Sequence, residues 1–148
     1  MRDQEWMRRR FVRSRIVSPL PVAFDLVIDV DNKPGALAEV AQAISDAGVN
    51  IAAATCVGPG DSAELHILVK HAEPVRHALG AISHLAVSRE REVVVVDVED
   101  RPGVLADLTR KIAKAGVNLD LVYVATRNRV VFGSPDLEAL KAVLDGSS

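Results

Sequence analysis

The chain has a single cysteine, Cys56, among 148 residues. An intrachain disulfide is therefore excluded, which suits a reducing compartment, and we expect a cytoplasmic protein. In an apolar segment, a lone cysteine most often serves as a small buried hydrophobic residue, and we expect this role for Cys56.

Aromatic residues and long apolar runs are also scarce. Aromatic residues make up 3% of the chain, and no apolar run approaches the ~18 residues of a membrane-spanning helix. Lysine and arginine number 18 against 20 for aspartate and glutamate, which gives a net charge of -2. No overall field attracts nucleic acid or an anionic membrane, so we expect neither as a partner. Arg8-Arg-Arg-Phe-Val12 weakly resembles a twin-arginine signal, but prolines and an aspartate follow it, and export is not expected.

The sequence contains a long internal repeat. Asp29-Val-Asp-Asn-Lys-Pro-Gly-Ala-Leu37 returns at position 97 as Asp97-Val-Glu-Asp-Arg-Pro-Gly-Val-Leu105, and Ala47-Gly-Val-Asn50 returns as Ala115-Gly-Val-Asn118. A repeat of this period marks one supersecondary unit written twice. Units of this size bury little surface alone. We therefore expect the two units to pack on each other, on another copy, or both.

Each repeat has the hydrophobic periodicity of alternating strands and helices. The first repeat predicts, in order, strand 23–30, helix 37–47, strand 50–57, strand 63–70, helix 73–80 and strand 84–87. The second predicts strand 93–98, helix 105–115, strand 118–126, strand 128–132 and a last helix, with Ser134 as its N-cap and Pro135 as its first residue. The expected fold class is α+β, with two ferredoxin-like βαββαβ units whose antiparallel sheets carry helices on one face.

Three segments follow from this pattern. They are an arginine-rich amino-terminal arm and linker over 1–21, a first unit over 22–88 and a second unit over 92–145, with Arg89-Glu-Arg-Glu92 as a polar join. The second unit lacks a fourth strand, and an open sheet edge is usually covered. We expect Arg10–Val17 to supply that strand. The alternative is that a neighbouring chain fills the edge or that it stays open.

The turn between the first strand and first helix of each repeat is a candidate binding site. Pro34 and Pro102 suit the first helical position, which would place Lys33 and Arg101 at the N-cap, where neither side chain can accept a hydrogen bond. Uncapped amides and the helix dipole attract a carboxylate. The amides concerned belong to Gly35, Ala36 and Leu37, and to Gly103, Val104 and Leu105.

Acidic and amide side chains precede each turn and could hold an ammonium group. They are Asp31 and Asn32 in the first repeat, and Glu99 and Asp100 in the second. Receptors for a carboxylate beside receptors for an ammonium describe a site for a zwitterion. The alternative is that the aspartate or asparagine folds back to cap the helix and that water fills the rest.

Asp31-Asn-Lys-Pro-Gly-Ala-Leu-Ala38, followed by Ala47-Gly-Val-Asn-Ile51, resembles the ACT domain, and Glu99-Asp-Arg-Pro-Gly-Val-Leu-Ala106 with Ala115-Gly-Val-Asn-Leu119 resembles a second one. The resemblance implies a βαββαβ regulatory module that binds amino acids or other small metabolites between paired domains and transmits the binding to an enzyme or regulator. It implies that the sites are lined by Asn32, Pro34, Gly35, Ala36, Leu37, Asp100, Pro102, Gly103, Val104 and Leu105. It also places Asn50 and Asn118, which open the second strand of each repeat, near the interface.

Signs of catalysis and of metal binding are weak. No nucleophile elbow, phosphate loop or paired catalytic carboxylate is present, so we expect no enzyme and no catalytic residue. The histidines at 66, 71, 77 and 84 lack the converging spacing of metal ligands, so we expect no metal and no cofactor. A contact of His66 with Cys56 across the hairpin is the alternative.

These observations predict a cytoplasmic, homodimeric protein with two ACT domains, which senses an amino acid and modulates a partner by shifting conformational populations. One alternative is a detached regulatory subunit of an amino-acid biosynthetic enzyme such as acetolactate synthase. The other is a transcription-related regulator that uses the basic arm, with an affinity that falls steeply with salt.

Overall fold

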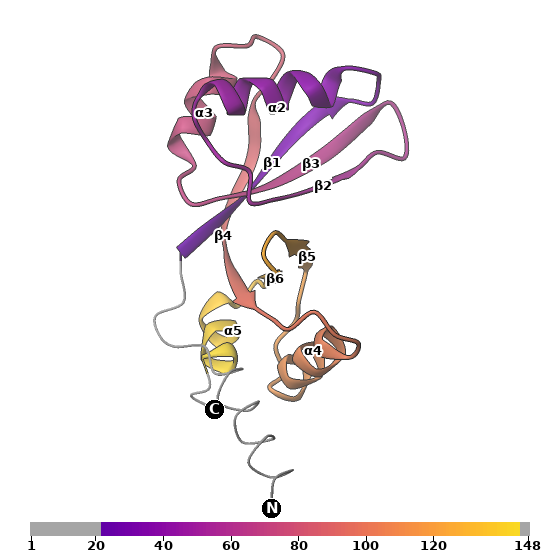
Figure 1. Cartoon of the computed structure of the whole chain (residues 1–148), viewed down its shortest axis with the longest axis vertical. Helices are drawn as coiled ribbons and strands as arrows, with labels where there is room; N and C mark the ends of the chain where they lie inside the picture. The colour runs from indigo at the N-terminus through magenta and orange to yellow at the C-terminus, as the bar shows by residue number, and fades with distance from the viewer. Residues whose placement is uncertain (1–21, 146–148) are drawn as a thin grey trace, which may run out of the picture. The chain divides into compact units, whose positions relative to one another are not determined.

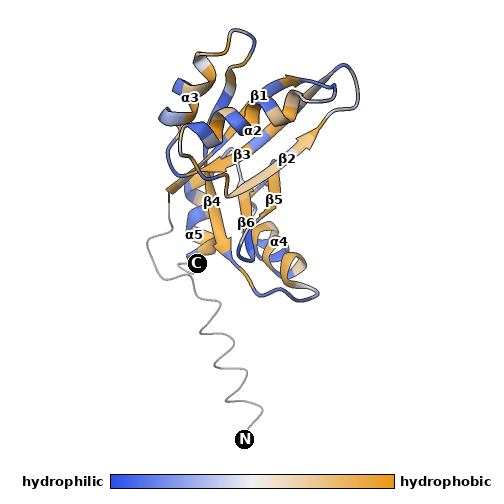
Figure 2. Cartoon of the chain, turned by 45° about the horizontal axis from the view of Figure 1, so that its top comes forward, coloured by the Kyte–Doolittle hydropathy of each residue, from blue (hydrophilic) through white to orange (hydrophobic). Residues whose placement is uncertain are grey.

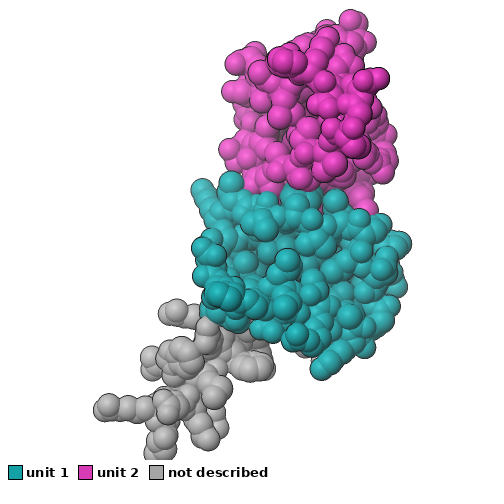
Figure 3. Space-filling model, turned by 90° about the vertical axis from the view of Figure 1, so that its right-hand side faces the viewer, with its two compact units in different colours: residues 1–21, 94–148 teal, residues 22–93 magenta. Residues whose placement is uncertain are grey.

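The computed structural model describes residues 22–145. These residues divide into two compact units, an amino-terminal unit over 22–93 and a carboxy-terminal unit over 94–145 (Figure 3). The Arg10–Val17 segment, which we expect to complete the second sheet, lies outside the described residues, so this role stays a prediction.

The amino-terminal unit has the predicted βαββαβ order (Figure 1). Its elements are β1 (Val22–Asp31), α2 (Ala36–Asp46), β2 (Ala53–Val57), β3 (Ser62–Val69), α3 (Glu73–Gly80) and β4 (Val87–Asp97). The strand order is β2-β3-β1-β4. Antiparallel pairing places Ile28 opposite Leu65 between β1 and β3, and Ala54 opposite Ile67 between β2 and β3. This is the arrangement of a ferredoxin-like fold.

The carboxy-terminal unit repeats this arrangement with fewer strands. It contains the last part of β4, then α4 (Val104–Lys114), β5 (Leu121–Ala125), β6 (Arg129–Gly133) and α5 (Leu137–Leu144). The strand order is β4-β6-β5, with Val94 opposite Phe132 and Val124 opposite Val130 in antiparallel register. Within residues 94–145 no strand follows α5, as the sequence predicts.

Each unit has its own hydrophobic core on one face of its strands. In the amino-terminal unit, alternate strand residues such as Leu26 and Ile67 pack with Val40 and Ile44 of α2 and with Leu79 of α3. Because both helices join one cluster with residues from one strand face, both helices cover that face. In the carboxy-terminal unit the cluster consists of Val94, Val96, Ile112, Val130, Phe132, Leu140, Val143 and Leu144. Figure 2 shows this pattern as mainly hydrophobic strands beside helices of mixed hydropathy.

The segment predicted as a polar join is part of a strand. Residues 89–92 lie inside β4, which runs without a break from Val87 to Asp97. Their charged side chains do not break the strand because they find partners outside the core: Arg89 pairs with Glu64, and Glu90 pairs with Arg76. The predicted strand over 84–87 begins only at Val87.

Cys56 is exposed, so the expectation of a buried thiol is wrong. It lies opposite the core residue Leu65, but β2 is the outermost strand of the amino-terminal unit, where burial is incomplete. None of the helices described over 22–145 has the length and apolar character needed to cross a membrane.

Candidate functional site

The first helix of each unit begins directly after a glycine in the left-handed region. Gly35 is the N-cap of α2 with φ +87°, and Gly103 is the N-cap of α4 with φ +89°. Glycine adopts such a φ without the steric cost that a Cβ brings. The prediction that Pro34 and Pro102 occupy the first helical position is therefore wrong, since both prolines lie in the turn before the helix.

Neither N-cap glycine has a side chain that could cap its helix. The alternative in which Asp31 or Asn32 folds back onto the start of α2 is wrong, because Asp31 Oδ2 lies 3.6 Å from Lys33 Nζ and Asn32 Nδ2 donates to Gly58 O and Gly60 O instead. In α2 the Ala36 N–H donates weakly to Lys33 O at 3.3 Å, and the Glu39 N–H donates to Gly35 O at 3.0 Å. The amides of Leu37 and Ala38, which lie between them in the first turn, have no intrahelical acceptor.

A small, open hollow of about 70 Å³ lies beside the start of α2. Its lining consists of Asp29, Val30, Asp31, Lys33, Ala36, Glu39, His84 and Leu85. Within this lining, His84 Nε2 lies 2.9 Å from Glu39 Oε1 and Lys33 Nζ lies 3.6 Å from Asp31 Oδ2. The hollow thus places carboxylates, two basic side chains and an uncapped helix start in one place.

Asn32 has a positioning role that sequence reasoning missed. Its Nδ2 donates to Gly58 O at 2.9 Å and to Gly60 O at 2.7 Å, and its backbone N–H donates to Asp61 O at 2.9 Å. The side-chain nitrogen fastens the candidate loop to the β2–β3 turn. Gly58 lies so close to the Asn32 side chain that a Cβ added at Gly58 would be 3.2 Å from Asn32 Cγ and 2.7 Å from Ala63 Cβ.

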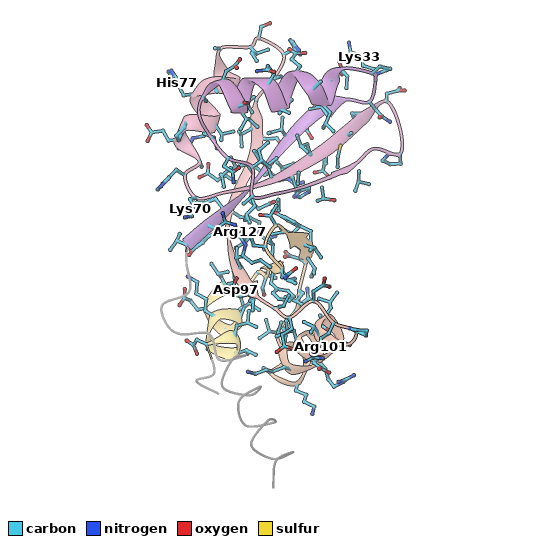
Figure 4. All side chains as sticks on the ribbon, in the orientation of Figure 1. Lys33, Lys70, His77, Asp97, Arg101 and Arg127 are labelled. Carbon is cyan, nitrogen blue, oxygen red and sulfur yellow. The ribbon has the colours of Figure 1, made fainter. Side chains whose placement is uncertain are left out.

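The corresponding loop before α4 is arranged differently. Arg101 Nε donates to Glu99 Oε2 at 3.0 Å, and Nη1 lies 3.3 Å from Pro102 O and 3.8 Å from Asp107 Oδ2. Asp100, which replaces Asn32, is exposed. Figure 4 shows Lys33 beside the start of α2 and Arg101 beside the start of α4.

The β5–β6 turn is also tighter than its counterpart. Arg127 and Asn128 adopt φ values of 60° and 54°, as in the two-residue turns that favour asparagine. The backbone N–H of Val98 donates to Asn128 O in this turn at 2.8 Å.

The predicted site residues separate into two groups. Asp31 and Ala36 line the hollow, Gly35 ends its turn, and the exposed side chains of Pro34 and Leu37 are not part of the lining. Asn50 lies after the far end of α2, whose 11 residues span about 16 Å. The structure therefore does not bring Asn50 to the hollow.

Most of the predicted site residues in the carboxy-terminal unit are exposed. Glu99, Pro102 and Gly103 are exposed, Val104 is half-buried and Leu105 is 44% exposed. Asn50 and Asn118 do not open β2 and β5 as expected, because these strands begin at Ala53 and Leu121.

The alternative contact between His66 and Cys56 is wrong. In the β2–β3 register His66 lies opposite Thr55, and Cys56 lies opposite Leu65. His66 Nδ1 instead lies 2.9 Å from Oδ2 of Asp25, which is 1% exposed. Within residues 22–145 no group of His, Cys, Asp and Glu side chains has the arrangement of a metal site.

The chain matches a known protein family. The ACT domain model matches the chain twice, over residues 24–85 and 93–144. The chain therefore belongs to the ACT domain family of regulatory modules and carries two ACT domains in tandem, as its repeated motifs indicate. No curated protein matches the chain.

Several solved structures are similar to the chain. A protein from Bacteroides thetaiotaomicron is 27% identical, with 88% of this chain and 91% of that chain covered and a TM-score of 0.76. The regulatory subunit of aspartate kinase from Thermus thermophilus is 19% identical, with coverages of 85% and 91% and a TM-score of 0.63. That from Thermus flavus is 20% identical, with coverages of 85% and 92% and a TM-score of 0.57. The two aspartate kinase subunits share the fold.

Proposed function

We propose that this tandem ACT protein senses a free amino acid, or a metabolite with the same charged groups, at the start of α2. The observation that carries the proposal is the hollow in which Asp29, Asp31 and Glu39 lie beside Lys33 and an uncapped helix start. A zwitterion needs opposite charges at short separation. The hollow offers partners for both of its charged groups.

The ligand carboxylate would bind at the amides of Leu37 and Ala38, where the helix dipole is positive. Lys33 adds a positive charge on the same side, and its side chain is 68% exposed. The ammonium group would bind to the carboxylates of Asp31 and Glu39. A zwitterion offers an opposite charge to the basic and to the acidic side chains, which an uncharged metabolite does not, so the site favours a zwitterion.

Regulation would follow from differential affinity. A ligand that binds one arrangement of the protein more tightly than another shifts the populations of the two. Two solved structures that share this fold are regulatory subunits of aspartate kinase, which supports an enzyme of amino-acid metabolism as the partner. We propose a regulatory rather than a catalytic role, in the cytoplasm.

We also propose that the chain forms a homodimer. β5 is an edge strand of the carboxy-terminal unit, its five residues carry no charge, and Val122 and Val124 are 41% and 69% exposed. Uncharged apolar edges of this kind tend to pair with another chain. Light scattering after size exclusion should report a dimer for the wild type and a monomer for Val124→Lys. A wild-type monomer at micromolar concentration would contradict this proposal.

A thermal-shift screen with individual L-amino acids at millimolar concentration tests the sensing function. A specific ligand at one hundred times its Kd stabilises the folded state by about 2.7 kcal/mol. Asp31→Asn and Glu39→Gln should abolish the shift, because each removes a charge that faces the ammonium group. Glu138→Gln is the matched control, since this side chain is 87% exposed on α5. A flat response of the wild type to every amino acid would reject the proposal.

A further inference from the structure

The hollow beside α2 has a second wall that the repeated motif does not supply. Six of its eight lining residues belong to the continuous stretch 29–39, whereas His84 and Leu85 come from the segment between α3 and β4. His84 reaches across to α2, since its Nε2 lies 2.9 Å from Glu39 Oε1. The imidazole thus already contacts a carboxylate that the proposed sensing function assigns to the ammonium group of the ligand.

The contact between His84 and Glu39 is open to exchange. The two side chains are 59% and 43% exposed, so water and small solutes reach both of them. Within residues 22–145, neither side chain has a second hydrogen bond or ion pair. An exposed pair of this kind is weak. An ammonium group that enters the hollow can therefore take the place of the imidazole on Glu39.

Protonation of His84 changes the charge of the hollow by one unit. The other charged lining residues are Asp29 and Asp31 from β1, Lys33 from the loop and Glu39 from α2, and of the described residues none from α3 is in the lining. Three carboxylates and one lysine give a charge of -2, which becomes -1 when the imidazole is protonated. Histidine is the side-chain type that ordinarily changes its charge between pH 5 and 8. A proton on His84 therefore competes directly with the charge of the ligand.

We infer that His84 is an internal competitor for the ammonium group of the ligand and that amino-acid sensing by this protein depends on pH. This inference rests on the proposed sensing function. When His84 carries a proton, the imidazolium neutralises Glu39, and the ligand must displace a cation in order to bind. When His84 is neutral, the negative charge of Glu39 is available to the ligand. Binding therefore strengthens as the pH rises and weakens as it falls.

Calorimetric titration at pH 7.5 and pH 5.5 tests the inference. The probe is the amino acid that gives the largest thermal shift among those without a titrating side chain. The Kd of the wild type should be about three- to tenfold higher at pH 5.5, because one ligand competes with one proton. The Kd of His84→Gln should agree within about twofold at the two pH values, since glutamine keeps a polar side chain that does not titrate.

A second measurement needs no variant. Titration of the wild type at pH 6.0, in buffers with different ionisation enthalpies, should show that binding releases a proton, as linkage requires. His77→Gln is the matched control, because His77 is an exposed histidine in the last turn of α3 and is not in the lining of the hollow (Figure 4). This control should keep the pH dependence of the wild type. Circular dichroism checks that each variant is folded.

The possible failures are distinguishable. A wild type that binds no amino acid at either pH rejects the proposed function and this inference with it. A wild type that binds with the same Kd at both pH values and releases no proton overturns the inference and leaves the proposed function standing. So does a His84→Gln variant that keeps the pH dependence, or a His77→Gln variant that loses it.

Discussion

The side-chain amide of Asn32 is a structural tie between two segments, and its removal is the most direct test of how the candidate loop is held. We expect Asn32→Ala to release the loop before α2 from the β2–β3 turn. The variant loses the two hydrogen bonds from Nδ2 to Gly58 O and Gly60 O, at 2.9 and 2.7 Å.

The magnitude follows from the number and the exposure of these bonds. An intramolecular hydrogen bond contributes about 0.5–1.5 kcal/mol net. Both bonds of Asn32 are exposed, so water can reach the released carbonyl groups and no desolvation penalty is added. We expect a loss of about 1–2 kcal/mol in the free energy of unfolding, with a fall in Tm of about 2–8 °C. Asn32→Asp should cost at least as much, because a carboxylate cannot donate to the two carbonyls.

Urea unfolding followed by circular dichroism measures this loss. Asp100→Ala is the matched control, since Asp100 occupies the same position of the second repeat and its side chain is exposed without a hydrogen bond among the described residues. The control should lie within about 0.5 kcal/mol of the wild type. The reasoning fails if both variants unfold at the same urea concentration as the wild type, or if the control loses as much stability as Asn32→Ala.

Three further substitutions probe the backbone, the core and the contact between His66 and Asp25, each by urea unfolding. Gly35→Ala should lower the free energy of unfolding by about 1–2 kcal/mol, because a Cβ is strained at φ +87°. Gly60→Ala is the control and should leave it nearly unchanged, since Gly60 has open space around it and no positive φ. Equal losses of stability in the two variants would contradict this reasoning. Phe132→Ala should cost about 3–5 kcal/mol, since the ring is fully buried, and a loss below 1 kcal/mol would refute the assigned core. His66→Ala should cost about 2–4 kcal/mol, because it removes a partner from the buried carboxylate of Asp25; wild-type stability would contradict that role.

The sequence predicts the element order because the relevant signals are local. Alternation in the segment before Asp31 and 3.6-residue spacing after Gly35 are properties of neighbouring residues, and the duplicated motif shows that the same unit occurs twice. The positions of β1, α2, β3 and α3 agree with the predictions to within one or two residues, which is the accuracy with which helix and strand ends are defined.

The polar segment 89–92 shows where local signals fail. Four charged residues in a row indicate a solvated join when the chain is considered alone. In the fold they extend β4, because Glu64 and Arg76 on other elements supply partners for Arg89 and Glu90. These partners lie 14 and 25 positions away in the sequence, so no local window contains them.

The candidate site shows the same division. The glycine turn, the uncapped helix start and Asp31 could be predicted, because they lie close together in the sequence. Asp29, Glu39 and His84, which also line the hollow, are not among the predicted site residues. The tie from Asn32 to Gly58 and Gly60 could not, since it spans 26 and 28 positions. Neither could the different partners of Lys33 and Arg101, because both are basic residues in the same motif.

The uninterrupted course of β4 has a practical consequence for anyone who divides this protein into its halves. The family matches end at 85 and resume at 93, which omits the opening residues of a strand that runs from Val87 to Asp97. A first-half fragment cut at 85 would lack the outermost member of its own sheet, and a second-half fragment begun at 93 would keep only the tail of that strand. Expression of either half should therefore include the whole of β4, so that both fragments carry a copy of the same eleven residues.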